Sequence, residues 1–170
     1  MLNFKEELTN IRGFAFDVDG VFSTSKLLLQ TDGDLIRSMN IRDGYSIVHA
    51  IKQGFIIGII TGGRSEAVKN RFLDLGVQDV YLGSYDKIVD FKDFIFKNGL
   101  DREHVLYMGD DLPDYEVMSY CGVPTCPADA AEEIKSISKY ISGFNGGEGC
   151  VRDVVEQVLR SQGKWINTGQ

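Results

Sequence analysis

Four short apolar runs, each long enough for one β-strand and each followed by polar residues, constrain the fold of this chain most strongly. They occupy residues 13–16, 55–60, 80–82 and 105–108. Consecutive rather than alternating apolar residues are typical of strands that are covered on both faces. Helical patterns lie between and after them, at residues 46–52, 65–75, 88–97, 115–121 and 151–159. This alternation predicts a Rossmann-like α/β fold, with three α/β/α layers around a mostly parallel sheet.

One segment interrupts the alternation directly after the first strand. Residues 26–30 and 35–39 have the pattern of two strands around a turn that contains Asp32-Gly33, which predicts a β-hairpin flap over residues 26–39. Its first arm holds three consecutive leucines, so we expect this arm to pack on something other than the parent sheet. A length of 170 residues predicts a single domain over residues 1–170, with a glycine-rich tail and C-terminal helix at 146–170.

The polar residues after the four runs predict one ligand site, because ligands of open parallel sheets bind outside the carboxyl ends of the strands. They are Asp17-Val18-Asp19, Thr61-Gly62, Lys87 and Gly109-Asp110-Asp111. Carboxylates crowded in this way need a cation, and Mg²⁺ prefers such hard oxygen ligands. A hydroxyl group, a helix N-terminus and an ammonium group are suited to an anion. This set of residues predicts phosphate chemistry with a divalent metal.

The charge balance favours a small-molecule substrate over a macromolecular partner. With 18 basic and 25 acidic side chains the net charge is −7, which repels nucleic acid and anionic lipid. No apolar run approaches the ~20 residues of a membrane helix, and no apolar signal segment precedes the first acidic residues. The three cysteines form no Cys-x-x-Cys pair, which is typical of free thiols in a reducing compartment. We therefore expect a cytoplasmic protein.

The motifs at the strand ends resemble a known family. Phe16-Asp17-Val18-Asp19-Gly20-Val21, Thr61-Gly62, Lys87 and Gly109-Asp110-Asp111-x-x-Asp114 resemble the four ordered motifs of the haloacid dehalogenase superfamily of phosphotransferases. The resemblance implies that Asp17 is the nucleophile that forms an aspartyl phosphate, and that Asp19 is the general acid and then the general base. It implies that Thr61 and Lys87 hold the phosphoryl group.

The same resemblance implies a magnesium site and its supporting residues. Asp17, the backbone carbonyl of Asp19, and Asp110 would bind Mg²⁺. Asp111 would orient water on the metal, and Asp114 would orient Lys87.

Members of the superfamily usually carry an inserted cap domain, and this sequence has no room for one. Only the hairpin follows the first motif, and only one helix and one strand separate Thr61 from Lys87. In capless relatives the hairpin of one subunit covers the pocket of the next. The resemblance therefore implies a homotetramer in which a neighbouring hairpin covers each site.

Within the capless group, the chain is similar to phosphatases that act on 3-deoxy-D-manno-octulosonate 8-phosphate in lipopolysaccharide sugar biosynthesis. The run Ile41-Arg42-Asp43-Gly44-Tyr45 and the tail Gly146-Gly147-x-Gly149-x-Val151-Arg152-Asp153 carry this similarity. Such a substrate has a carboxylate as well as a phosphate, so Gly62, Arg42 and Arg64 are expected to contact it.

Two alternatives stay open at this point. One is a phosphatase for nine-carbon keto-deoxy sugar acid 9-phosphates of the sialic acid type, whose members tend to have an acidic residue where this chain has Gly63-Arg64. The other is a phospho-receiver regulatory domain, which shares Asp, Thr and Lys at strand ends. A receiver has no acid–base residue two positions after its phosphoacceptor, whereas this chain has Asp19.

Overall fold

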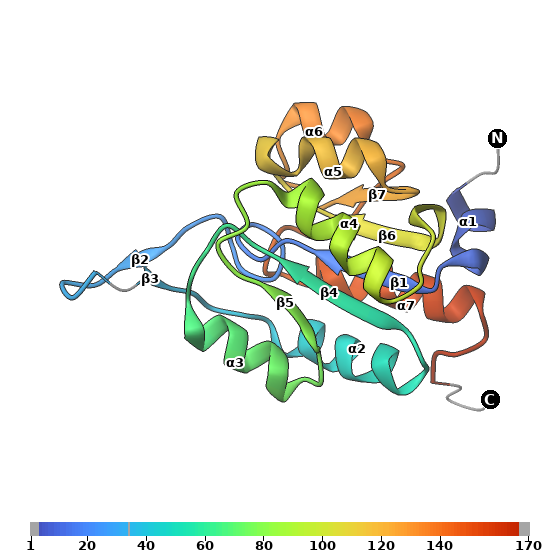
Figure 1. Ribbon diagram of the computed structural model, residues 1–170, viewed down its shortest axis with the longest axis horizontal. Coiled ribbons are helices and arrows are strands. Elements are labelled where there is room, and N and C mark those ends of the chain that lie inside the picture. The colour runs from blue at the N-terminus through green and yellow to red at the C-terminus, as the bar shows by residue number, and fades with distance from the viewer. Residues whose placement is uncertain (1–3, 34, 167–170) are drawn as a thin grey trace.

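The computed structural model of the protein, which describes residues 4–33 and 35–166, contains a six-stranded sheet between two layers of helices (Figure 1). The strand order is β5 (Asp79–Tyr81), β4 (Ile56–Ile60), β1 (Gly13–Phe16), β6 (Val105–Met108), β7 (Val123–Cys126) and β8 (Tyr140–Ile141). Each adjacent pair is parallel, which confirms the expected α/β fold. Residues 1–3, 34 and 167–170 lie outside the described part, and with them one residue of the expected hairpin and the end of the expected tail.

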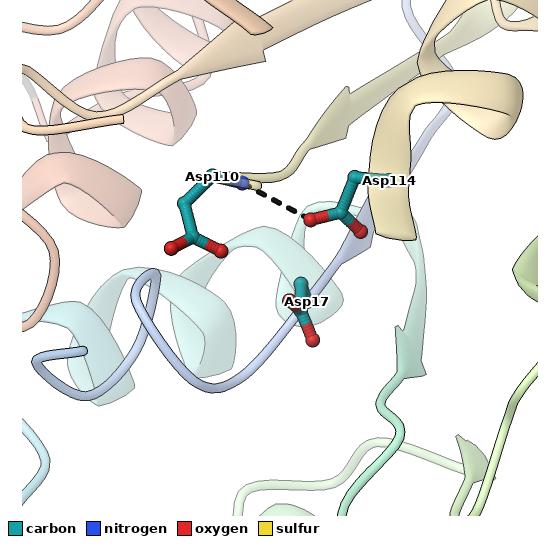
Figure 2. Close-up of side chains that lie close together, drawn as sticks. All are labelled: Asp17, Asp110 and Asp114. Atoms are coloured by element: carbon teal, nitrogen blue, oxygen red, sulfur yellow. Dashed lines mark hydrogen bonds between the residues drawn. The ribbon is translucent and has the colours of Figure 1, made fainter. Parts of the chain in front are cut away.

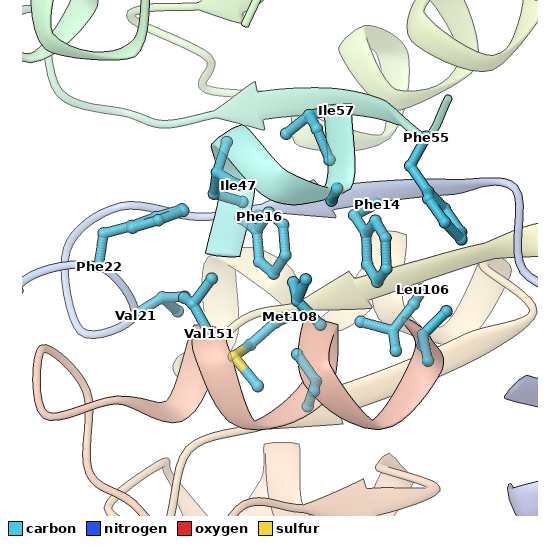
Figure 3. Close-up of a cluster of buried hydrophobic side chains, with 14 of the residues drawn as sticks. Phe14, Phe16, Val21, Phe22, Ile47, Phe55, Ile57, Leu106, Met108 and Val151 are labelled. Atoms are coloured by element: carbon cyan, nitrogen blue, oxygen red, sulfur yellow. The ribbon is translucent and has the colours of Figure 1, made fainter. Parts of the chain in front are cut away.

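Two hydrophobic cores lie on opposite faces of the sheet, because successive residues of a strand point to opposite faces. The first contains Phe14 and Phe16 (Figure 3), and its helices are α2 (Ile41–Lys52), α3 (Glu66–Asp74) and α7 (Cys150–Ser161). The second contains Ala15, and its helices are α4 (Lys87–Lys97), α5 (Tyr115–Tyr120) and α6 (Glu132–Ile137). The consecutive apolar residues of β1 are therefore shared between both cores. The short helices are α1 (Phe4–Glu7), η1 (Leu8–Asn10), η2 (Arg102–His104) and η3 (Leu112–Asp114).

Strands β7 and β8 and helix α6 go beyond the elements expected from the sequence. β7 contains Pro124, which has no backbone N–H to donate and therefore weakens the strand pattern. In the sheet, the Pro124 carbonyl accepts a hydrogen bond from the Lys139 N–H at 2.8 Å, and the Thr125 hydroxyl donates to the Tyr107 carbonyl at 3.0 Å. Tertiary hydrogen bonds thus hold a strand whose own residues indicate it poorly.

The hairpin is present and is shorter than expected. β2 (Leu28–Leu29) pairs antiparallel with β3 (Leu35–Ile36), and the pair projects away from the sheet (Figure 1). Leu28 and Leu29 are 68% and 81% exposed, so they do not pack on the parent sheet of their own chain. No cap domain is present in the part of the chain that the structure describes. Within that part, no helix is long and apolar enough to cross a membrane.

Residues 41–45 and residues 146–153, on which the similarity to sugar acid phosphatases rests, contact each other. Asp43, in the first turn of α2, is fully buried, and its Oδ1 accepts a hydrogen bond from the Arg152 N–H in the first turn of α7 at 2.8 Å. Burial raises the pKa of Asp43 to about 6. The glycine-rich segment before α7 packs on the loop after β1: a Cβ atom at Gly146 would lie 1.9 Å from the carbonyl oxygen of Gly20. The Gly147 N–H also donates to the Val21 carbonyl at 2.8 Å, so the glycine-rich segment supports the loop that carries Asp19.

Candidate active site

The expected site residues meet at the carboxyl ends of β1, β4 and β6. A pocket of about 420 Å³ lies there. Eight of the expected residues line it: Asp17, Asp19, Thr61, Gly62, Lys87, Asp110, Asp111 and Asp114. The parallel sheet brings them together because all of its strands present the same ends at this edge.

Lys87 is the first residue of α4 and lies between two carboxylates. Its Nζ is 2.9 Å from Asp17 Oδ2 and 2.7 Å from Asp114 Oδ1, and its side chain is 4% exposed. Burial alone would lower the pKa of Lys87, but the two carboxylates outweigh it and raise this pKa. The ammonium group therefore stays charged within the site.

Asp17 is buried at the end of β1, with both carboxylate oxygens in hydrogen bonds. Oδ1 accepts from the Val18 N–H at 2.7 Å, and Oδ2 faces Lys87. Burial and then the charge of Asp114 raise the pKa of Asp17, and Lys87 opposes them in part. One lysine thus offsets only part of the negative charge around Asp17.

Asp114 is held by residues on three sides. Its Oδ1 accepts from Lys87 and from the Tyr107 hydroxyl at 2.8 Å, and its Oδ2 accepts from the Asp110 N–H at 3.1 Å (Figure 2). From the sequence, Tyr107 is expected only as an apolar strand residue. Its one signal was a hydroxyl group at the penultimate position of β6. Asp114 therefore positions Lys87, and Tyr107 fixes Asp114.

The residues present fit a divalent cation. Carboxylate oxygens of Asp17, Asp110 and Asp114 all lie within 4.8 Å of one another (Figure 2). Asp114 is fully buried and accepts three hydrogen bonds, whereas Asp17 has two such partners, so Asp17 and Asp110 are the carboxylates better placed to bind the ion. Burial, followed by the charge of Asp114, raises the pKa of Asp110 to about 7. These hard oxygen donors are the kind that could hold a divalent cation such as Mg²⁺.

Glycine at position 20 is required by this arrangement. Gly20 has a φ of 85°, and a Cβ atom there would lie 1.9 Å from Asp110 Oδ2.

Asp111 also lines the pocket, and its Oδ1 accepts from the Leu112 N–H at 2.8 Å, which caps η3. Thr61 is buried, and its hydroxyl accepts from the Gly63 N–H at 3.1 Å.

The structure places Arg42 away from the pocket that the other expected residues line. Because α2 begins at Ile41, Arg42 belongs to that helix and lines a separate pocket with Arg152 and Glu156 of α7. Arg64 stacks over Tyr85, with its Cζ 5.2 Å from the ring centroid, and Tyr85 lines the active-site pocket. Arg64 is therefore at the rim.

Arg37, which no sequence motif pointed to, contacts the pocket residue Asp19. Its Nε lies 2.6 Å from Asp19 Oδ1 and its second terminal nitrogen 3.0 Å from Asp19 Oδ2. The second hairpin arm is expected over residues 35–39, which makes Arg37 one of its strand residues. In the structure β3 ends at Ile36, so Arg37 directly follows the strand.

Comparisons with known proteins agree with this geometry. A family model for haloacid dehalogenase-like hydrolases matches residues 76–153. The 3-deoxy-D-manno-octulosonate 8-phosphate phosphatase of Escherichia coli K12 is 36% identical over 155 residues, which cover 91% of this chain and 82% of that protein. The chain therefore belongs to the haloacid dehalogenase-like hydrolases, and among them it is a phosphatase.

Two solved structures narrow the comparison to one kind of phosphatase. The 3-deoxy-D-manno-octulosonate 8-phosphate phosphatase of Yersinia pestis has a TM-score of 0.91 at 34% identity, covering 94% of this chain and 86% of that one. The same enzyme of Moraxella catarrhalis, in complex with magnesium ion, phosphate ion and KDO, has a TM-score of 0.91 at 30% identity, covering 95% of this chain and 92% of that one.

Proposed function

We propose that this chain is a magnesium-dependent phosphatase that hydrolyses 3-deoxy-D-manno-octulosonate 8-phosphate to the free sugar acid and phosphate, in lipopolysaccharide sugar biosynthesis. The observation that carries the proposal is the contact of Lys87 with Asp17 and Asp114 beside Asp110, in a chain 36% identical to such an enzyme. A cytoplasmic location fits this activity and the three buried free cysteines.

Asp17 acts as the nucleophile in this mechanism. One of its oxygens bonds to phosphorus, the bond between phosphorus and the sugar oxygen breaks, and Asp19 gives a proton to that oxygen. In the second step Asp19 takes a proton from water, whose oxygen attacks phosphorus and releases phosphate from Asp17. Splitting the hydrolysis in this way replaces one slow displacement by two easier ones.

The other residues of the pocket hold the reacting groups in place. Thr61 and Lys87 bind the phosphoryl oxygens, and Gly62 and Arg64 contact the rest of the substrate. Asp17, the backbone carbonyl of Asp19, and Asp110 would hold Mg²⁺, with Asp111 orienting its water. The ion, when bound, supplies neutralisation of the charge on the transferring phosphoryl group.

The test is a comparison of phosphate release from the eight-carbon 8-phosphate and from a nine-carbon keto-deoxy sugar acid 9-phosphate. We expect the larger kcat/KM on the eight-carbon substrate, and a fall of at least ~100-fold after chelation with EDTA that added Mg²⁺ reverses. A larger kcat/KM on the nine-carbon substrate would overturn the substrate assignment. Phosphorylation that persists without turnover would instead indicate a receiver domain.

We further propose a homotetramer in which the β2–β3 hairpin of one subunit covers the pocket of its neighbour. The exposure of Leu28 and Leu29 supports this, since burying such side chains stabilises an interface by about 25 cal/mol per Å². Light scattering at assay concentration is expected to give a tetramer. A monomer with full activity under the same conditions would contradict closure by a neighbouring hairpin.

A further inference from the structure

Arg37 connects the hairpin to the active site of its own subunit. It follows β3 directly, and its side chain is only 6% exposed because it lies against the pocket wall. Two nitrogens of its guanidinium group contact the two oxygens of Asp19, at 2.6 and 3.0 Å. The third donates to the Leu35 carbonyl at 2.8 Å, which anchors the group to the hairpin.

The pocket wall provides space for this guanidinium group at Gly63. A Cβ atom at that position would lie 3.2 Å from a terminal nitrogen of Arg37 and 3.7 Å from Asp19 Oδ2. Gly63 is not among the glycines with positive φ, so backbone conformation does not require glycine there. The missing side chain instead leaves room for the Arg37–Asp19 pair.

The pair determines the orientation of the Asp19 carboxylate. A bidentate contact between a guanidinium and a carboxylate fixes the plane of the carboxylate as well as its position. The Ser23 hydroxyl adds a hydrogen bond to Asp19 Oδ1 at 3.2 Å. Asp19 itself remains 32% exposed toward the pocket, so it is held on one side and open on the other.

We propose that Arg37 is a positioning residue that aims the Asp19 carboxyl at the sugar oxygen of the substrate. This inference rests on the proposed function, in which Asp19 exchanges a proton with that oxygen. Misplacing a reacting group by about 1 Å costs on the order of 100-fold in rate. The hairpin is therefore part of the catalytic apparatus of its own subunit, in addition to any cover that it gives a neighbour.

Three substrates separate this role from the alternatives. The sugar acid 8-phosphate has an alkoxide leaving group and a carboxylate. Ribose 5-phosphate has the same kind of leaving group without the carboxylate, and p-nitrophenyl phosphate has a leaving group that departs without a proton. The measurement is kcat/KM, which reports formation of the phosphoenzyme, for wild type, Arg37→Gln, Arg37→Lys and Gly63→Ala.

For Arg37→Gln we expect kcat/KM to fall by about 100-fold on both sugar phosphates and by less than about 5-fold on p-nitrophenyl phosphate. Arg37→Lys retains the positive charge but cannot make the bidentate contact, and Gly63→Ala crowds the guanidinium group. For both variants we expect kcat/KM on the sugar phosphates to lie between the values for wild type and Arg37→Gln. Arg12→Gln is the matched control, since Arg12 directly precedes β1 at the end opposite the site and is exposed. It should match wild type on all three substrates.

Each other result overturns the proposal in a distinct way. An equal fall on all three substrates would indicate a general structural role, and thermal melts of each variant would show whether the fold is lost. A lower kcat/KM on the sugar acid phosphate alone would indicate that Arg37 binds the substrate carboxylate. An unchanged kcat/KM on all three substrates would indicate that Arg37 has no role in catalysis. Wild type that hydrolyses none of the three would overturn the proposed function rather than the role of Arg37.

Discussion

Replacing Asp17 by Asn is expected to lower kcat by at least about 1000-fold while the protein remains folded. An amide cannot form the acyl phosphate, and it binds a cation more weakly than a carboxylate does. Because burial raises the pKa of Asp17, the ionised carboxylate is unfavourable in the folded protein without Mg²⁺. Loss of that charge should therefore leave the thermal midpoint in the absence of Mg²⁺ close to that of wild type.

Two measurements check this expectation besides turnover. Mass spectrometry after rapid quenching should find a phosphorylated form of wild type and none of Asp17→Asn. Addition of Mg²⁺ should raise the melting temperature of wild type more than that of the variant, since a ligand stabilises the state that binds it. Residual activity above a tenth of wild type would exclude the aspartyl-phosphate mechanism.

Replacing Lys87 by Met is expected to cost both activity and stability. Lys87 is buried between Asp17 and Asp114, so the variant leaves two buried carboxylates without their cation. Removing one partner of a buried ion pair lowers the free energy of unfolding by about 3–5 kcal/mol. Activity should fall by at least ~100-fold, because the phosphoryl group loses its positive partner.

The stability loss should depend on pH with a defined sign. Burial already raises the pKa of Asp17, and without Lys87 this pKa rises further above its value in the unfolded chain. The folded state then holds protons that the unfolded state has already released, so the free energy of unfolding falls as pH rises. The deficit relative to wild type should be larger at pH 8 than at pH 5, and Mg²⁺ should reduce it.

Lys97→Met is the matched control on the same helix. Lys97 is the last residue of α4 and pairs with Asp79, but its side chain is 50% exposed. Asp79 is buried, but it also accepts a hydrogen bond from the Asn98 side chain at 2.8 Å, and the Lys97 ammonium group is half exposed. The loss of stability should therefore be much smaller than for Lys87→Met. Denaturant titrations of both variants make the comparison. If Lys87→Met unfolded at the same midpoint as Lys97→Met, the ion-pair account of Lys87 would be wrong.

Local pattern was sufficient for the central sheet. β1, β4, β5 and β6 lie within one or two residues of their expected bounds, because strands that are buried on both faces need unbroken apolar runs. β7 was missed because Pro124 removes the donor that marks a strand interior. Its place depends on the Lys139 N–H and on the Thr125 hydroxyl, which only the folded chain brings to it.

The sequence by itself determined which residues lie at the carboxyl ends of the strands, because strand ends follow from local apolar runs and parallel strands share one edge. For that reason the sequence was enough to predict that Asp17, Thr61, Lys87 and Asp110 lie close together. Only the tertiary structure decided which arginine side chains lie near them. Arg37 contacts the pocket residue Asp19, whereas Arg42 lines a separate pocket, because the course of the hairpin and the start of α2 at Ile41 set the direction of each side chain. Such directions depend on packing between segments distant in sequence, which no local pattern records.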